Sequence, residues 1–401
     1  MEGKHLFKKL IFISLIFSLL SGCWSAKELT DLAIVSAMGI EKSGDDYILT
    51  VQIINPGDIA GKTQTTRVAV STYSIKGRSI FEAIRKLSKH APRKLYFAHL
   101  RLVVIGKELA KEGISKALEL MSRDHEFRTD FYLLVSKKNT PSEILNVLTP
   151  IEKNPSNKVF NTIEVSYKNW APTARVNLDE LINKLTATGN NPVLTGIIIE
   201  GNKNISGSLE NVESIPSSAN LMLDNLAIFQ DEKLVGWLDQ EESKGYNYIT
   251  DNVINTVAVL DWQDGNITLE FTNSSTKVTV VNSGNNRPKI MVDVFPEAQI
   301  GEVQADIDLT KEEIIKEVEQ VTNERGHKVL TDVIKKAQNL QTDIFGFGEA
   351  IHRADPKTWN KLEEKWNEEG FPELEVEINF QTTIRRLGTT NESFLNEMEG
   401  K

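Results

Sequence analysis

The sequence predicts an α+β protein of two to three domains, in which mixed and antiparallel sheets pack against helices, preceded by a cleaved lipoprotein signal peptide. Helix and strand patterns alternate through the first half of the chain, which favours a mixed sheet covered by helices. The second half contains hairpin turns and a strictly alternating strand, which are typical of antiparallel pairing. A length of 401 residues with 40% hydrophobic and 25% charged residues suits a folded protein with more than one core.

The first two dozen residues have the pattern of a bacterial export signal. Lys4, Lys8 and Lys9 give a positive start, and residues 10–20 are apolar apart from two serines. This run is about half of the roughly 20 residues that a membrane-spanning helix needs. The pattern therefore predicts a signal peptide over residues 1–22.

The signal ends in Leu20-Ser21-Gly22-Cys23, the pattern of a lipobox, and Cys23 is the one cysteine of the chain. An unpaired exported cysteine is exposed to oxidants unless it is modified. We therefore expect Cys23 to be the site of lipid attachment, with an S-diacylglyceryl group and an N-acyl chain such as palmitate. Two or three acyl chains attach a protein stably to a membrane. The alternative is an ordinary export signal with an incidental cysteine.

The charge balance bears on partners. A formal net charge of −10 argues against nucleic acid, for which basic faces supply most of the affinity. It also argues against a polybasic contact with anionic lipid, so the expected membrane contact is the lipid anchor. After cleavage no cysteine beyond Cys23 remains for disulfides or thiolate metal ligands.

The first half shows strands and helices in turn. Alternating or continuous apolar runs and turn residues predict strands over 32–40, 47–53, 67–75, 100–105 and 130–136, with helices over 80–87 and 108–121. Further along, Pro141 opens a short helix, Asn177 caps a helix over 178–185, and 192–199 is a strand.

Composition divides the chain. Residues 201–220 are rich in Gly, Ser and Asn and have little apolar periodicity, which is typical of a linker or a long loop. We predict a signal peptide at 1–22, an N-terminal α+β region at 23–205, a linker at 206–220, a C-terminal α+β domain at 221–390 and a tail at 391–401. The N-terminal region is divisible into subdomains of about 23–138 and 139–205.

The second half is expected to begin with a hairpin of strands 221–229 and 233–238. Asp239 and Glu242 form a capping box for a short helix that ends at Gly245. A second hairpin, 253–262 with 267–271, turns at 264–266, and strands 278–281 and 289–295 follow. Another capping box at 310–313 opens the longest helix, which extends to 344. Asp355-Pro356 starts a helix that ends at Gly370, and 374–384 is a strand with one wet face.

No catalytic constellation is recognisable. Neither a phosphate-cradling loop nor a Gly-x-Ser-x-Gly elbow occurs, and Gly346-Phe347-Gly348 lacks the third glycine of a dinucleotide loop. Glu349 and His352 have the Glu-x-x-His spacing of di-iron bundles, but such a site needs two copies of the motif. His90 and His99 are predicted to be packing or hydrogen-bonding residues. We therefore predict no catalytic residue, no metal and no cofactor.

Several of these stretches together resemble the Ger(x)C lipoproteins, the C subunits of nutrient germinant receptors in spore-forming bacteria. The resemblance is carried by GCWSAKEL at 22–29, LYFAHL at 95–100 and DIFGFGE at 343–349, followed by His352-Arg353, Trp359, Trp366 and Phe371-Pro372. It implies a three-domain α+β body without known catalytic residues. It also implies assembly with two polytopic membrane subunits, A and B, at the outer face of the spore inner membrane.

The leading expectation is therefore a lipid-anchored, non-enzymatic receptor subunit required for spore germination. One alternative is a solute-binding lipoprotein of an importer, which requires two similar α/β lobes with a cleft between them. Another is a cell-surface hydrolase acting on peptidoglycan, which requires a carboxylate or metal cluster in a cleft.

Overall fold

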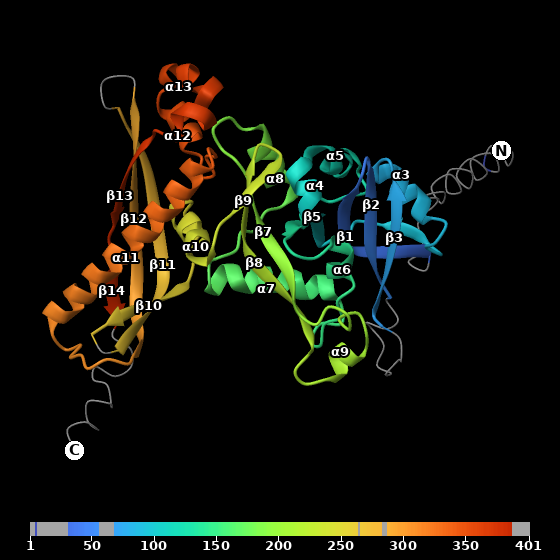
Figure 1. Ribbon diagram of the computed structural model, residues 1–401, viewed down its shortest axis with the longest axis horizontal. Coiled ribbons are helices and arrows are strands. Elements are labelled where there is room, and N and C mark those ends of the chain that lie inside the picture. The colour runs from blue at the N-terminus through green and yellow to red at the C-terminus, as the bar shows by residue number, and fades with distance from the viewer. Residues whose placement is uncertain (1–4, 6–30, 56–67, 264, 283–286, 387–401) are drawn as a thin grey trace.

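Two sheets covered by helices lie side by side along the longest axis of the molecule, with helix α10 (Gln240–Ile249) between them (Figure 1). The structure is a computed structural model that describes residues 5, 31–55, 68–263, 265–282 and 287–386. Strands and helices contribute to both sheet regions, which confirms the predicted α+β class.

The first sheet has the strand order β3-β2-β1-β5-β6-β7-β8-β9, with β4 beside β1. Its centre is parallel, because β1, β5, β6 and β7 all run in one direction, whereas hairpins form both ends. The strands are β1 (Leu32–Ser43), β2 (Asp46–Ile54), β3 (Val70–Gly77), β4 (Lys94–Tyr96), β5 (Leu102–Gly106), β6 (Tyr132–Ser136), β7 (Val193–Gly201), β8 (Ala219–Gln230) and β9 (Lys233–Trp237).

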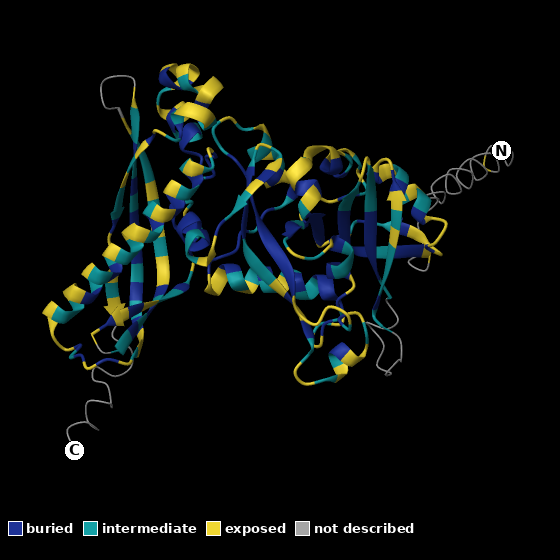
Figure 2. Ribbon diagram, in the orientation of Figure 1, coloured by how far each residue is buried: buried dark blue, intermediate teal, exposed yellow. Residues whose placement is uncertain are grey.

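Helices cover both faces of this sheet. Val103 and Ile105 of β5 belong to one core cluster and Leu102 and Val104 to another, because successive strand residues point to opposite faces. Figure 2 shows the buried residues gathered on the central strands. The helices are α3 (Ile80–Leu87), α4 (Lys107–Glu112), α5 (Ser115–Arg123), α6 (Pro141–Leu145), α7 (Pro155–Asn169), α8 (Leu178–Thr186) and α9 (Glu210–Glu213).

The predicted cap of α8 is confirmed, one predicted helix is divided into two, and one helix was not predicted. Asn177 caps α8 through a capping box, as its sequence predicts. The helix predicted over 108–121 is two helices, because Gly113 has a φ of 137° that no helix continues through. Helix α7 was not predicted, although Asn154 caps it and Pro155 occupies its first turn.

Residues 219–237 extend the first sheet. The predicted linker at 206–220 contains α9 and the start of β8, and β8 pairs with β7 from Ala219 to Ile228. The hairpin of β8 and β9 forms as predicted, but it lies at the edge of the first sheet. The boundary at 221 therefore falls inside a strand, and which segments fold as independent domains stays a prediction.

The second sheet is built on two long strands. Strands β10, β11 and β12 are antiparallel, and β13 and β14 both pair in parallel with β12. Helix α11 lies across this sheet and the smaller helices sit at one end of it (Figure 1). The elements are β10 (Thr256–Trp262), β11 (Gly265–Asn282), β12 (Pro288–Val303), α11 (Glu312–Asn339), α12 (Phe347–Ala354), α13 (Pro356–Leu362), a 3-10 turn (Glu363–Lys365), a π turn (Trp366–Gly370), β13 (Glu375–Phe380) and β14 (Thr383–Arg386).

Five details of the second half differ from the prediction. The strands expected at 278–281 and 289–295 are parts of β11 and β12, and the expected strand 374–384 is β13 and β14, paired in parallel rather than antiparallel. Helix α10 passes through Gly245, whose lack of a side chain lets Val333 of α11 approach. No capping box opens α11, because the helix begins at Glu312 with Lys311 at its N-cap, and the Thr310 hydroxyl donates to Asp308. Helix α11 ends at Asn339 rather than 344.

Candidate functional site

Cys23, the predicted lipid-attachment residue, lies outside the described residues. Within the part of the chain that the structure describes, no helix is both long and apolar enough to span a membrane. The lipid anchor therefore stays a prediction.

Buried polar side chains connect the two sheets at a contact that we call the joint, and α10 lies at its centre. Asn247 on α10 is almost fully buried and donates from Nδ2 to the carbonyl oxygens of Ala171, at 2.6 Å, and Thr173, at 3.1 Å. Thr256 of β10 donates to the Trp170 carbonyl oxygen at 2.9 Å. The loop after α7 is thus bonded directly to the second half of the chain.

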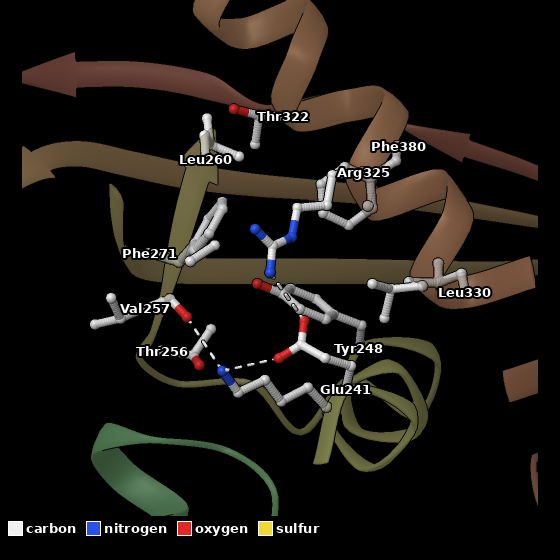
Figure 3. Close-up of a pocket in the computed structure, with 14 residues that line it drawn as sticks. Glu241, Tyr248, Thr256, Val257, Leu260, Phe271, Thr322, Arg325, Leu330 and Phe380 are labelled. Atoms are coloured by element: carbon white, nitrogen blue, oxygen red, sulfur yellow. Dashed lines mark hydrogen bonds and ion pairs between the residues drawn. The ribbon is translucent and has the colours of Figure 1, made fainter. Parts of the chain in front are cut away.

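A charged network continues this contact (Figure 3). The Lys244 side chain is only 7% exposed; its Nζ lies 3.1 Å from the Val257 carbonyl oxygen, 3.6 Å from Glu241 Oε1 and 3.8 Å from the centre of the Trp170 ring. Burial lowers the pKa of Lys244. Glu241 also pairs with Arg325 of α11 at 3.3 Å, so one carboxylate joins α10 to α11.

Beside this network is a cavity of about 40 Å³ lined by apolar side chains that include Leu260, Phe271, Leu330 and Phe380. A water needs roughly 10–15 Å³ of such volume, so the cavity is far smaller than a ligand pocket. Burial raises the pKa of Tyr248, which lines the cavity, and keeps the phenol neutral. The network and the cavity are packing features of the joint.

A larger hollow of about 470 Å³ lies on the α7–α8 side of the joint. Its polar groups bond to one another: Tyr132 donates to Glu164 at 2.5 Å, Lys184 donates to the Tyr246 hydroxyl at 3.0 Å, and Tyr167 donates to Asn252 at 3.1 Å. Burial and the Glu164 carboxylate raise the pKa of Tyr132. The contacts of Lys184 and Tyr167 join side chains of both halves and strengthen the joint.

Asp343 organises a second contact between the halves. Its side chain is fully buried, and its two carboxylate oxygens accept hydrogen bonds from the backbone N–H groups of Phe345, Gly346, Phe347 and Gly348 and from the indole N–H of Trp366, at 2.8–3.2 Å. Burial raises the pKa of Asp343 to about 6, and the five donors oppose that rise. The carboxylate therefore satisfies the N-terminus of α12.

The loop before β7 packs on this cluster from the first half. The Asn191 backbone N–H donates to the Asp343 carbonyl oxygen at 2.7 Å. Its side chain donates to Asn367 at 3.2 Å and accepts from the Asp231 N–H at 2.8 Å. A Cβ on Gly189 would lie 2.5 Å from the Trp359 ring, so only glycine allows this approach. The DIFGFGE segment is thus part of the joint between the halves.

The other residues weighed in the sequence occupy ordinary positions. Glu349 pairs with Arg353 at 3.1 Å, and exposed His352 stacks on Trp359 at 6.0 Å between ring centres. His90 and His99 are both exposed. Gly346 has a φ of 75° and precedes α12, so these glycines form the entry to α12. Among the described residues no three His, Cys, Asp or Glu side chains gather as metal ligands would.

Sequence reasoning did not single out Lys244, Asn247 or Asn191 as joint residues. The structure places Lys244 and Asn247 in a run of buried residues at the end of α10, where a polar side chain is unusual. Asp343 lies in the DIFGFGE segment that carries the family resemblance, but no local sequence pattern predicts the five hydrogen-bond donors around its carboxylate.

Asn247→Ala tests whether the α10 contact holds the joint. Removing the amide leaves two buried carbonyl oxygens without their donor, so we expect the free energy of unfolding to fall by about 1–3 kcal/mol. Urea unfolding followed by circular dichroism measures it. The control is Asn273→Ala on an exposed position of β11, where a change below about 0.5 kcal/mol is expected. Equal effects of both substitutions would contradict the role of Asn247.

Two protein-family models match this chain, one in each half. The family model described as the spore germination protein N-terminal domain matches residues 25–199, and the model described as spore germination B3/GerAC like, C-terminal, matches residues 224–388. The chain is 37% identical to spore germination protein KC of Bacillus subtilis (strain 168), covering 98% of each chain. It is 23% identical to spore germination protein A3 of the same strain, covering 92% of this chain and 95% of that protein. The crystal structure of the GerBC protein matches with a TM-score of 0.55 at 20% identity, over 86% of this chain and 96% of that one, which shows a shared fold.

Proposed function

The chain belongs to the spore germination GerAC family, and from this premise we propose that it is the lipid-anchored, non-enzymatic C subunit of a membrane receptor for nutrient germinants. The observation that carries the proposal is similarity along the whole chain: both family models match, and the 37% identity to spore germination protein KC extends over 98% of each protein.

The sequence adds the place of action. The export signal with its lipobox supports attachment through Cys23 to the outer face of the spore inner membrane. Attachment raises the effective concentration of the body beside membrane partners, which we propose are the polytopic A and B subunits. A body without a recognised catalytic motif fits a role in binding and assembly.

The joint between the two sheets supports this role, because it holds the two halves of the chain together. Buried polar contacts at α10 and beside Asp343 connect the two halves: Asn247 donates to the Ala171 carbonyl oxygen, and the Asn191 side chain donates to Asn367. Such contacts fix orientation as well as stability, because each unpaired buried group carries a cost. The subunit is therefore proposed to present partner surfaces on both sheets as one rigid unit.

The topology disfavours the solute-binding alternative. An importer's binding protein needs two similar lobes, but in the described residues the first sheet has a parallel centre and the second is built on antiparallel β10, β11 and β12. The apolar cavity near the joint has a volume of only about 40 Å³, and in the larger hollow of about 470 Å³ polar groups of the two halves bond to one another.

The experiment is removal of the gene from its own spore-forming host. We expect the spores to lose their response to the nutrient that this receptor detects, scored by the fall in optical density as spores hydrate. Reintroducing the intact chain should restore the response. Spores that germinate normally with every amino acid and sugar tested, in a strain without related receptors, would refute the proposal.

A further inference from the structure

The first sheet has a hollow at the carboxyl ends of its parallel strands. Its volume is about 680 Å³. Its walls are the last residues of β1, β5 and β6, the first turn of α4 and the loop from β6 to α6.

The path of the chain explains why a hollow forms here. After β5 the chain enters α4, whose Leu109 packs into the core cluster of Val103. After the adjacent β6 it enters α6, whose Ile144 packs into the other cluster, on the opposite face. Connections from neighbouring parallel strands thus separate to opposite faces. In open sheets with parallel strands, this is the point at which a crevice opens and ligands bind.

The lining is rich in lysine. It contains five lysines and three glutamates: Lys42, Lys107, Lys137, Lys138, Lys203, Glu41, Glu108 and Glu143. Most of these charges have partners close by, such as Lys137 with Asp224 at 2.9 Å and Lys203 with Glu143 at 2.8 Å.

Two of the lysines do not. Within the described part of the chain, Lys107 and Lys138 form no ion pair; Lys107 is partly buried and Lys138 is exposed. Lys107 is thus a cation partly removed from water without a counter-ion, which is unfavourable, and a bound anion would relieve this cost.

Glu41 is the remaining charged group of the hollow. It is partly buried and accepts a hydrogen bond from the Ser142 N–H at 2.9 Å. Burial, and then the nearby Glu143, raise its pKa. Even when ionised, Glu41 supplies one negative charge against the two positive charges of Lys107 and Lys138. The unpaired positive charge of the two lysines therefore exceeds the negative charge.

We propose that this hollow binds a small soluble oxyanion, a compound with a phosphate or carboxylate group, between Lys107 and Lys138. The chain enters β1 at Leu32, and a strand rises about 3.3 Å per residue, so the hollow lies roughly 30 Å from that entry. The choice of a free anion over a lipid head group takes the entry to β1 as the end nearest the membrane, and that part alone rests on the proposed anchor at Cys23.

The test uses the full-length chain purified in detergent, titrated by calorimetry with inorganic phosphate and with citrate at constant ionic strength. We expect saturable binding of at least one probe. The double substitution Lys107→Gln and Lys138→Gln should weaken it by about tenfold or more, because two charge-assisted hydrogen bonds are lost. Preference for phosphate or for citrate identifies the class of oxyanion.

The matched control is Lys89→Gln with Lys116→Gln, two exposed lysines outside the hollow that change the net charge equally. Its affinity should stay within about twofold of the unmodified chain. Absence of saturable binding up to about 10 mM of either probe, or an equal loss in the control, would overturn the proposal. The germination phenotype of the deletion is a separate readout, so failure here leaves the proposed function standing.

Discussion

Asp343→Ala is expected to lower the free energy of unfolding by at least about 3 kcal/mol. The substitution removes the acceptor of four backbone N–H groups at the start of α12 and of the Trp366 indole N–H. These donors are buried, so most of them cannot turn to water. The substitution should also loosen Asn191, which bonds to the backbone of the same residue.

Denaturant unfolding measures this effect, and Asp261→Ala is the control. Asp261 is an exposed residue of β10, so its loss should change stability by less than about 0.5 kcal/mol. Asp343→Asn should lie between the two, because its amide keeps one acceptor oxygen but places an N–H₂ group among donors. If Asp343→Ala were as stable as the control, the carboxylate would not be what holds the DIFGFGE segment.

Cys23→Ala is expected to have the largest effect on location. Each methylene of an acyl chain contributes about 0.8 kcal/mol to membrane binding, so losing two or three chains should reduce membrane retention by far more than tenfold. The measurements are the share of the protein that stays with washed membranes and the incorporation of labelled palmitate. The nutrient response of the spores should be impaired in parallel.

Ser25→Ala is the matched control for this experiment, because it changes a neighbouring residue and leaves the thiol and the lipobox intact. It should retain both labelling and membrane association. Normal membrane association and normal germination of Cys23→Ala spores would contradict lipid attachment at this residue.

Features set by neighbouring residues could be predicted from the sequence. The caps Asn177, Asp239 and Asp355 each bond to backbone N–H groups two or three positions ahead, and all three were recognised. Features set by distant pairing could not. The alternation of β8 predicts a hairpin, but only its pairing with β7 places it in the first sheet.

The joint could not be predicted either, because its contacts connect residues that are far apart in the sequence. Asn247 bonds to residues more than 70 positions away, and Asn191 to a residue more than 150 away. Local periodicity contains no information about such partners. The resemblance located the DIFGFGE segment, whereas its physical role, a buried carboxylate satisfying a helix start against the opposite half, required the structure.

Co-purification from spore inner membranes tests directly whether this chain is a subunit of a membrane receptor. A tagged, functional copy of the chain is extracted in mild detergent, and the bound proteins are identified by mass spectrometry, with an unrelated tagged lipoprotein as the control. We expect two polytopic membrane proteins, the A and B subunits, to accompany this chain and not the control. Recovery of the chain alone, or with the components of a solute importer, would contradict it.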